Sequence, residues 1–177
     1  MMKMRQSITT TPEMRMTPLN EDLKVKVKLT QQEMMVGCTT GMTRHIESVA
    51  NNRQPRFPEK YTGQLLLSHQ LGACAELAYC KIFNIFYSPT VNTFHVADIG
   101  DDVEVRYSNL NYLKVRKDDN NIYCVSMCGN LQYFRYNGWI WSEDAKKEEW
   151  IKDFGGHGKP AYFVPTENLN KGEIERT

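Results

Sequence analysis

Three features that would place the chain outside the cytoplasm are missing from the sequence. The five cysteines include no Cys-x-x-Cys pair, and their odd number argues against a disulfide framework. No apolar run approaches the ~20 residues of a membrane-spanning helix. Residues 1–18 are polar and Met-rich, without the apolar segment of a secretory signal. We therefore expect a cytoplasmic protein with no membrane partner.

An excess of either charge is also missing. Lysine and arginine together number 22 against 21 acidic residues, which leaves a net charge of +1. Strongly basic domains indicate nucleic-acid binding by composition, and this chain does not. A nuclease is not excluded, because metal-binding carboxylates cancel part of a basic surface in a count over the whole chain.

The length of 177 residues suits one domain with a sizeable core and is short for two. No repeat and no composition change marks a boundary within it. We expect a flexible leader over residues 1–20, a single domain over 21–165 and a polar tail over 166–177.

Hydrophobic periodicity predicts both helices and strands. Residues 23–30 alternate apolar side chains with lysines, as in a half-buried strand. Thr30 and Glu33 have the spacing of a capping box, which predicts a helix ending near residue 52, and a second helix, apolar nearly all round, is expected over 62–84. Further strands are expected near 92–98, 102–108, 111–117, 121–128, 131–141 and 161–165, with a short helix over 142–151. Helices beside antiparallel hairpins indicate a mixed α+β or α/β fold.

Glu76 is the most informative single residue. Its neighbours three and four positions away on the second helix are small or apolar, which places its carboxylate on a buried face. A buried carboxylate without a partner costs several kcal/mol or takes up a proton. Glu76 must therefore meet a cation, a hydrogen-bond donor or a metal, and a structural ion pair with an Arg or Lys is as good an explanation as a functional one.

A second group of charged residues follows in the segment "ADIGDDVEVRYS". Glu104 and Arg106 share one face of the predicted strand 102–108, because side chains alternate at period two. Asp98 precedes a turn at Gly100, so its carboxylate and that of Glu104 can converge on a hard cation such as Mg²⁺. Which of Asp98, Asp101 and Asp102 is the metal-binding acid stays open. The simpler alternative is a solvated hairpin whose charges keep an edge strand soluble.

This order, a helix Glu, then an Asp, then Glu-x-Arg on a strand, resembles the PD-(D/E)XK nuclease superfamily. The similarity to small phage-encoded members spans residues 24–165, and its most specific pieces are "GACAELA", "ADIGDDVEVR" and "GWI". The resemblance implies a restriction-endonuclease-like core, a central mixed sheet flanked by helices. It also implies that Glu76 is the helix acid, Asp98 the strand acid and Glu104 the acid of the E-x-K element, with Arg106 in place of the usual lysine.

By the same resemblance we expect a metal-dependent deoxyribonuclease, in the host cytoplasm if it is phage-encoded. Mg²⁺ or Mn²⁺ would be held by Asp98, Glu104 and the main-chain carbonyl of Val105, while Glu76 would bind a second ion or orient the water. DNA would be contacted by a set of basic residues, namely Lys24, Lys26, Lys28, Arg53, Arg56 and Lys60. The oligomeric state, including a homodimer, is left open.

Arg106 supports a second hypothesis. An arginine keeps its charge where a lysine can lose its proton and help to activate water. Arg106 can still clamp the scissile phosphate, but the substitution also suits a catalytically silent fold that binds nucleic acid or a protein. The aromatic side chains of 131–141 could stack on bases, although in a strand Tyr133 and Tyr136 are more typical of sheet packing.

Overall fold

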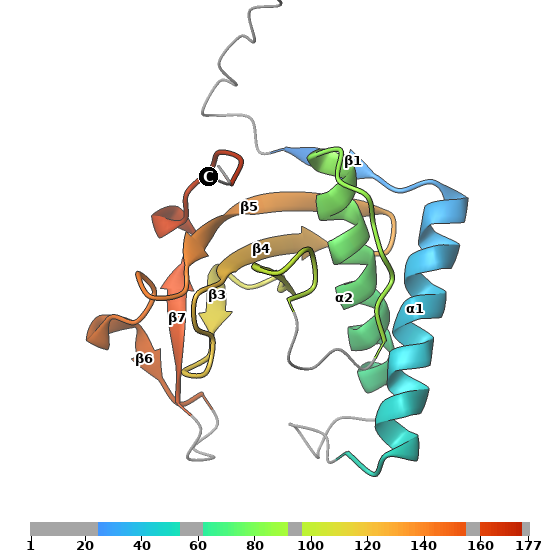
Figure 1. The fold of residues 1–177 in the computed structure, drawn as a ribbon, viewed down its shortest axis with the longest axis horizontal. Coiled ribbons are helices and arrows are strands. Elements are labelled where there is room, and N and C mark those ends of the chain that lie inside the picture. Colours follow the sequence, from blue (N-terminus) through green and yellow to red (C-terminus); the bar gives the residue numbers. More distant parts are fainter. Residues whose placement is uncertain (1–24, 54–61, 92–96, 155–159, 175–177) are drawn as a thin grey trace, which may run out of the picture.

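The computed structural model describes residues 25–53, 62–91, 97–154 and 160–174. Two helices lie side by side next to a curved sheet, and helix α2 lies between helix α1 and that sheet (Figure 1). A second, smaller sheet lies on the far side of the first from the helices. This is the mixed α+β architecture that the periodicity predicts.

Helix α1 (Gln31–Ala50) begins where the sequence predicts it. The main-chain N–H of Glu33 donates to Thr30 Oγ1 at 3.2 Å, and Glu33 Oε2 accepts from the N–H of Thr30 at 2.6 Å. This is the predicted capping box, which satisfies two of the N–H groups that a helix start leaves unpaired. The helix ends at Ala50 with Asn51 as its C-cap, and Asn52 follows with a φ of 50°.

Helix α2 (Thr62–Ile82) has its C-terminal half at the centre of the core, with all residues from Ala73 to Cys80 buried. Helix α1 packs against it through two glycines. A Cβ on Gly41 would lie 2.4 Å from the Cα of Gln70, and one on Gly37 would lie 2.6 Å from Cys74 Sγ. The two backbones can therefore approach closely only because neither position carries a side chain.

The larger sheet has the strand order β1-β5-β4-β2. Its strands are β1 (Lys26–Lys28), β5 (Tyr133–Trp141), β4 (Tyr123–Gly129) and β2 (Val103–Tyr107). Strand β5 is antiparallel to both β1 and β4, whereas β2 runs parallel to β4. The smaller sheet contains β3 (Tyr112–Val115), β7 (Ala161–Pro165) and β6 (Ile151–Lys152) in the order β3-β7-β6.

Two expectations about the elements are corrected. The expected run of antiparallel hairpins is interrupted: the consecutive strands predicted at 102–108 and 111–117 do not pair, because β2 and β3 belong to different sheets. The helix expected over 142–151 is a turn followed by the 3-10 helix η1 (Glu148–Trp150) and by β6. Ser142 is fully buried, and its N–H and hydroxyl bond to the main chain of Ile122, which draws this segment away from helical geometry.

The predicted strand 92–98 lies mostly outside the described residues, as does the predicted leader 1–20. The described part of the predicted tail packs on the domain: Leu169 and Ile174 are buried, and Asn170 bonds to the main chain of Trp139. Within the part of the chain that the structure describes, neither helix has the length and apolarity needed to traverse a bilayer.

Candidate functional site

The helix acid Glu76 is buried, as predicted, and its partner is an arginine. Its side chain is 4% exposed, and both carboxylate oxygens accept hydrogen bonds from Arg44 on α1, at 2.5 and 2.8 Å. The Nε–H of Arg44 donates to the carbonyl of Thr90 at 2.8 Å. A two-point contact of this kind is the strong form of an ion pair. Of the partners considered for Glu76, the structure supplies a cation from the neighbouring helix.

Asp98 lies beside β2, the strand at one end of the larger sheet among the described residues. Gly100, with a φ of 62°, forms a tight turn that is closed by two main-chain hydrogen bonds between Ile99 and Val103, of 3.0 and 3.3 Å. This turn brings Asp98 back beside the edge strand β2, where its Oδ2 accepts from the N–H of Val105 at 2.8 Å. The turn at Gly100 was predicted from the sequence, and it positions the acid.

Three acidic side chains influence one another at this edge. Burial, followed by the negative charges of Glu76 and Glu104, raises the pKa of Asp98 to about 8. Burial also raises the pKa of Glu76, while the hydrogen bonds from Arg44 oppose that rise. The helix acid, the strand acid and the acid of the E-x-R element thus form one electrostatic cluster, which we call the acid cluster (Glu76, Asp98 and Glu104).

Arg106 shares a face of β2 with Glu104, as the alternation predicts, but its guanidinium is directed to the loop after β3. Both terminal nitrogens contact the carboxylate of Asp119 at 2.8 Å, and one of them also donates to the carbonyl of Lys114. The contact with Glu104 is longer, at 3.4 Å. Burial opposes the charge, but the hydrogen bond to Asp119 outweighs it and raises the pKa of Arg106. Arg106 thereby joins β2 to the smaller sheet.

The acid cluster as placed does not fit a metal site made from all three acids. Both oxygens of Glu76 are bonded to Arg44, and Glu104 lies 3.4 Å from Arg106 and 4.0 Å from Arg116. In the described ranges, no group of three or more His, Cys, Asp or Glu side chains is arranged to hold a metal ion. Arginines supply the positive charge that an ion would otherwise bring. The Mg²⁺ or Mn²⁺ expectation stays a prediction.

The raised pKa of Asp98 predicts how stability depends on pH. In the unfolded chain this carboxyl has a pKa of about 3.9, and in the folded protein the pKa is about 8. The folded state therefore holds the proton more tightly, so this contribution to stability is complete below pH ~4 and is lost progressively as the pH rises to ~8. Asp98→Asn should lose less stability than the parent between pH 5 and pH 8 in urea unfolding. Equal losses in both proteins would show that Asp98 ionises normally.

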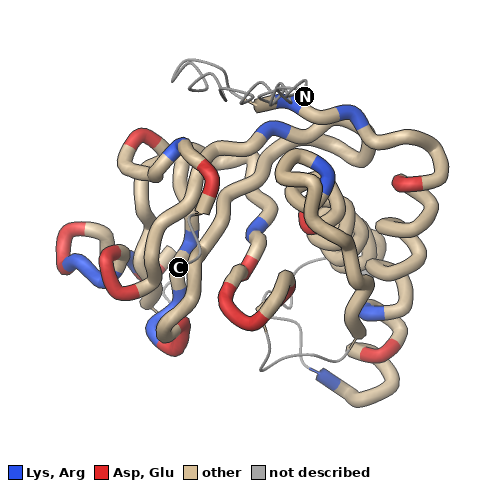
Figure 2. Tube along the Cα trace, turned by 45° about the horizontal axis from the view of Figure 1, so that its top comes forward, with Lys and Arg blue, Asp and Glu red and all other residues tan. Residues whose placement is uncertain are grey.

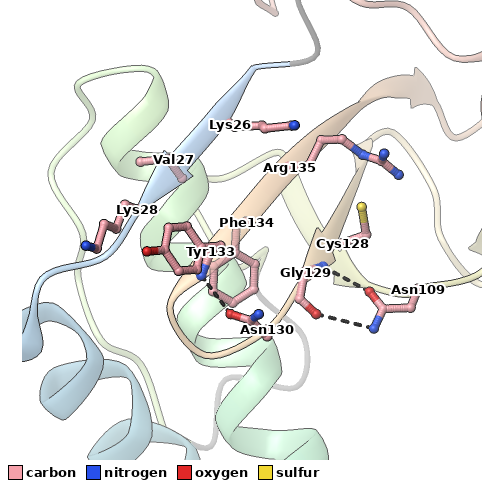
Figure 3. Close-up of a pocket in the computed structure, with 10 residues that line it drawn as sticks. All are labelled: Lys26, Val27, Lys28, Asn109, Cys128, Gly129, Asn130, Tyr133, Phe134 and Arg135. Carbon is pink, nitrogen blue, oxygen red and sulfur yellow. Dashed lines mark hydrogen bonds between the residues drawn. The ribbon is translucent and has the colours of Figure 1, made fainter.

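A second candidate site lies on the outer face of the larger sheet, near its β1 edge. Strand β1 pairs with β5 so that Lys26 is opposite Arg135 and Lys28 is opposite Tyr133. These four side chains form what we call the basic face. They line a surface pocket of about 680 Å³, and the other described residues that line it are Val27, Asn109, Cys128, Gly129, Asn130 and Phe134. Figure 3 shows Lys26 and Arg135 pointing to the same side of the sheet.

The basic face contains cations and an exposed aromatic ring but no acid. Tyr133 is 51% exposed, and the Nζ of Lys28 lies 5.5 Å from the centre of its ring. Like charges placed directly opposite on neighbouring strands destabilise a sheet, so the pair Lys26–Arg135 has a cost that a bound anion would remove. Lysines that merely protect an edge strand would explain Lys26 and Lys28. They do not explain Arg135, which lies on the next strand inward.

The structure brings together only part of the basic set predicted to contact DNA. Lys26 and Lys28 lie on the basic face, whereas Lys24, Arg56 and Lys60 are outside the described residues. Arg53 follows the end of α1, about 30 Å along that helix from β1. Arg135 was missed. The alternation of 131–141 could have indicated its outward face, but its pairing with Lys26 depends on the strand register.

No family model, curated protein or solved structure matches the chain.

Proposed function

We propose that the protein binds nucleic acid through the basic face of β1 and β5. The observation that carries this proposal is the placement of Lys26 directly opposite Arg135, beside an exposed tyrosine, in a pocket whose described lining residues include no acidic side chain. Lysine and arginine bind backbone phosphates by charge, and a tyrosine ring offers a surface on which a base can stack. Phosphate and base together are the ligand that this combination fits best.

The interior charges favour binding without hydrolysis. Glu76 is held by Arg44, and Arg106 is held by Asp119, so two of the residues that the nuclease hypothesis assigns to catalysis already have partners of opposite charge inside the fold. The acid cluster then acts as a structural charge network. This corresponds to the hypothesis of a catalytically silent nuclease-like fold, and the mixed sheet with a Glu-bearing helix against it is compatible with a restriction-endonuclease-like origin.

A metal-dependent nuclease is the second candidate, and one observation favours it. Asp98 is a partly buried acid whose hydrogen bond comes from a main-chain N–H and whose pKa is raised by burial and then by two neighbouring carboxylates. A divalent cation is the ligand that would ionise such a group. If this candidate is correct, Mg²⁺ at pH 8 stabilises the folded parent against urea and does not stabilise Asp98→Asn.

Binding is tested by fluorescence anisotropy with a labelled single-stranded oligonucleotide and with the matching duplex. We expect Lys26→Gln combined with Arg135→Gln to weaken binding roughly tenfold and to reduce the salt slope by about 1.4, since each phosphate contact to a single strand contributes about 0.7. Tyr133→Ala should weaken binding to the single strand more than binding to the duplex, because bases stack on a ring only when they are unpaired.

The matched control is Lys117→Gln combined with Lys152→Gln, which removes the same charge from exposed positions outside the basic face. It should bind as the parent does. Equal weakening in both double variants would show a general charge effect and would contradict the assignment of the basic face. The same samples, incubated with plasmid and with Mg²⁺ or Mn²⁺, separate the two candidates: cleavage that is lost in Glu104→Gln supports the nuclease.

A further inference from the structure

The outer side of helix α1 has an unusual surface. Ten of its residues are exposed and none of them is charged: Gln31, Gln32, Met35, Val36, Thr39, Met42, Thr43, Ile46, Val49 and Ala50. Figure 2 shows the same feature along the chain, where most of α1 carries no acidic or basic position. We call the four large apolar members of this set that share one side of the helix the α1 face (Met35, Met42, Ile46 and Val49); Val36, 45% exposed, lies to one side of it.

The spacing of the α1 face produces a straight stripe. Met35, Met42 and Val49 repeat every seven residues, and Ile46 lies one turn beyond Met42, so their side chains follow one line along the helix. Their exposures are large, from 44% at Met42 to 62% at Met35. An ordinary surface helix places charged residues on the side that faces water. This helix places apolar side chains there.

The charged residues of α1 are already used within the chain. Glu33 contacts Lys81 at 2.7 Å, and Arg44 is bonded to Glu76. Glu47 accepts from the side chain of Asn51 at 3.3 Å. The α1 face is therefore neutral. Its exposed methionines do not belong to a charged surface.

The absence of charge restricts what can cover the α1 face. Nucleic acid needs cations against its phosphates, and a helix lying on a membrane surface carries Lys or Arg on its polar side. Neither is present on the exposed side of this helix. A second copy of the same neutral stripe meets no like-charge repulsion, and a stripe with an approximate centre can pair with itself.

We propose that the protein forms a homodimer in which the α1 faces of two copies pack antiparallel about a two-fold axis near Met42. The midpoint between Met35 and Val49 is residue 42, so each Met35 meets the partner's Val49, and each Met42 meets its own counterpart. The last turn of α1 contains no basic residue beside its partially negative carbonyl end, whereas its first turn contains the acidic Glu33. In the antiparallel arrangement the carbonyl end of each helix, partially negative, lies beside the partially positive amino end of the other.

The size of the α1 face indicates a reversible dimer. A stripe of this kind exposes roughly a few hundred Å² of apolar surface per chain. Two such surfaces bury close to the lower limit of about 1,000 Å² that specific interfaces reach. We therefore expect dissociation at roughly micromolar concentrations.

The oligomeric state is measured by sedimentation equilibrium of the full chain from about 1 to about 100 µM. The parent should shift from monomer to dimer within this range. Met42→Glu places two carboxylates against each other on the axis and should leave a monomer throughout. Leu110→Glu, at an exposed position in the turn between β2 and β3, makes the same change in charge away from α1 and should dimerise as the parent does.

A cross-link between two copies tests the position of the two-fold axis near Met42. Its result does not depend on the stability of Met42→Glu. Under mild oxidation Met42→Cys should form a disulfide between two copies in excess of the parent, whose five cysteines provide the baseline, while Leu110→Cys should not. A parent that is monomeric at all concentrations overturns the proposal and assigns the α1 face to another protein or to residues outside the described ranges. A dimer that Met42→Glu leaves intact overturns it as well, because the interface then lies elsewhere.

Discussion

Arg44→Met should lower the free energy of unfolding by about 3–5 kcal/mol, the usual cost of removing one partner from a buried ion pair. The substitution leaves the carboxylate of Glu76, 4% exposed, without the guanidinium that bonds both of its oxygens. Urea unfolding followed by tryptophan fluorescence measures the loss. The loss of stability should be larger at pH 8 than at pH 5. As the pH falls, Glu76 can take up a proton and then no longer carries an unpaired buried charge.

The double variant Arg44→Met with Glu76→Met shows whether the loss comes from the unpaired charge. Exchanging both partners for apolar side chains of similar size is often neutral or stabilising, so the double variant should recover most of the stability. Lys81→Met is the matched control, because Lys81 pairs with Glu33 where both side chains are about one third exposed. Such a pair contributes about 1 kcal/mol or less. If Arg44→Met costs no more than Lys81→Met, Glu76 is not held in the ionised form.

The elements that local signals specify were predicted well from the sequence. The capping box of Thr30 and Glu33 marks the start of α1, and the apolar content of 62–84 marks the buried helix α2. Strands β2, β3, β4, β5 and β7 all lie within the segments whose alternation predicted them, or within one residue of them. In each case the sequence pattern and the element that it predicts occupy the same residues, so the prediction did not require any contact with distant residues.

Strand pairing and the turn after β5 could not be predicted in this way. The short connection between β2 and β3 suggests a hairpin, yet β2 pairs with β4 in parallel and β3 pairs with β7. Arg106 contributes to this arrangement, because it bonds the carbonyl of Lys114 on β3 from across the gap between the two sheets. The segment 142–151 has a helical pattern, but its buried Ser142 is tied to the main chain of Ile122. Both outcomes depend on contacts between distant residues.

The candidate sites also contain features that the local sequence predicted and features that depend on contacts between distant residues. The burial of Glu76 followed from the apolar residues around it, but its partner Arg44 lies 32 residues earlier, on a helix whose periodicity does not single it out. The lysines of β1 were expected to bind DNA, whereas Arg135 and the exposed Tyr133 become neighbours of those lysines only through the register of β1 on β5. The residue types indicated which charged and aromatic side chains the sites could contain. The packing of the helices and the register of the strands determine which of these side chains are neighbours.

The second large effect is expected at Arg106, where the nuclease hypothesis and the structure assign different roles. Arg106→Met leaves Asp119, 7% exposed, without the guanidinium that contacts it through both terminal nitrogens. We expect a loss of about 3–5 kcal/mol in the free energy of unfolding. Arg116→Met is the matched control, because Arg116 is about half exposed and its guanidinium reaches Glu104 only at 4.0 Å. It should cost about 1 kcal/mol or less.

Arg106→Lys separates the structural role from the catalytic one. An ammonium keeps the positive charge but cannot reproduce the forked contact with Asp119 together with the bond to the carbonyl of Lys114. If Arg106 joins the two sheets, this variant loses about 1–3 kcal/mol, the cost of buried hydrogen-bonding groups left without a partner, and gains no cleavage of plasmid with Mg²⁺. Parental stability together with new Mg²⁺-dependent cleavage would contradict the structural role. It would identify the protein as a nuclease silenced at this position, because a lysine able to approach water and phosphate would then have restored the missing group.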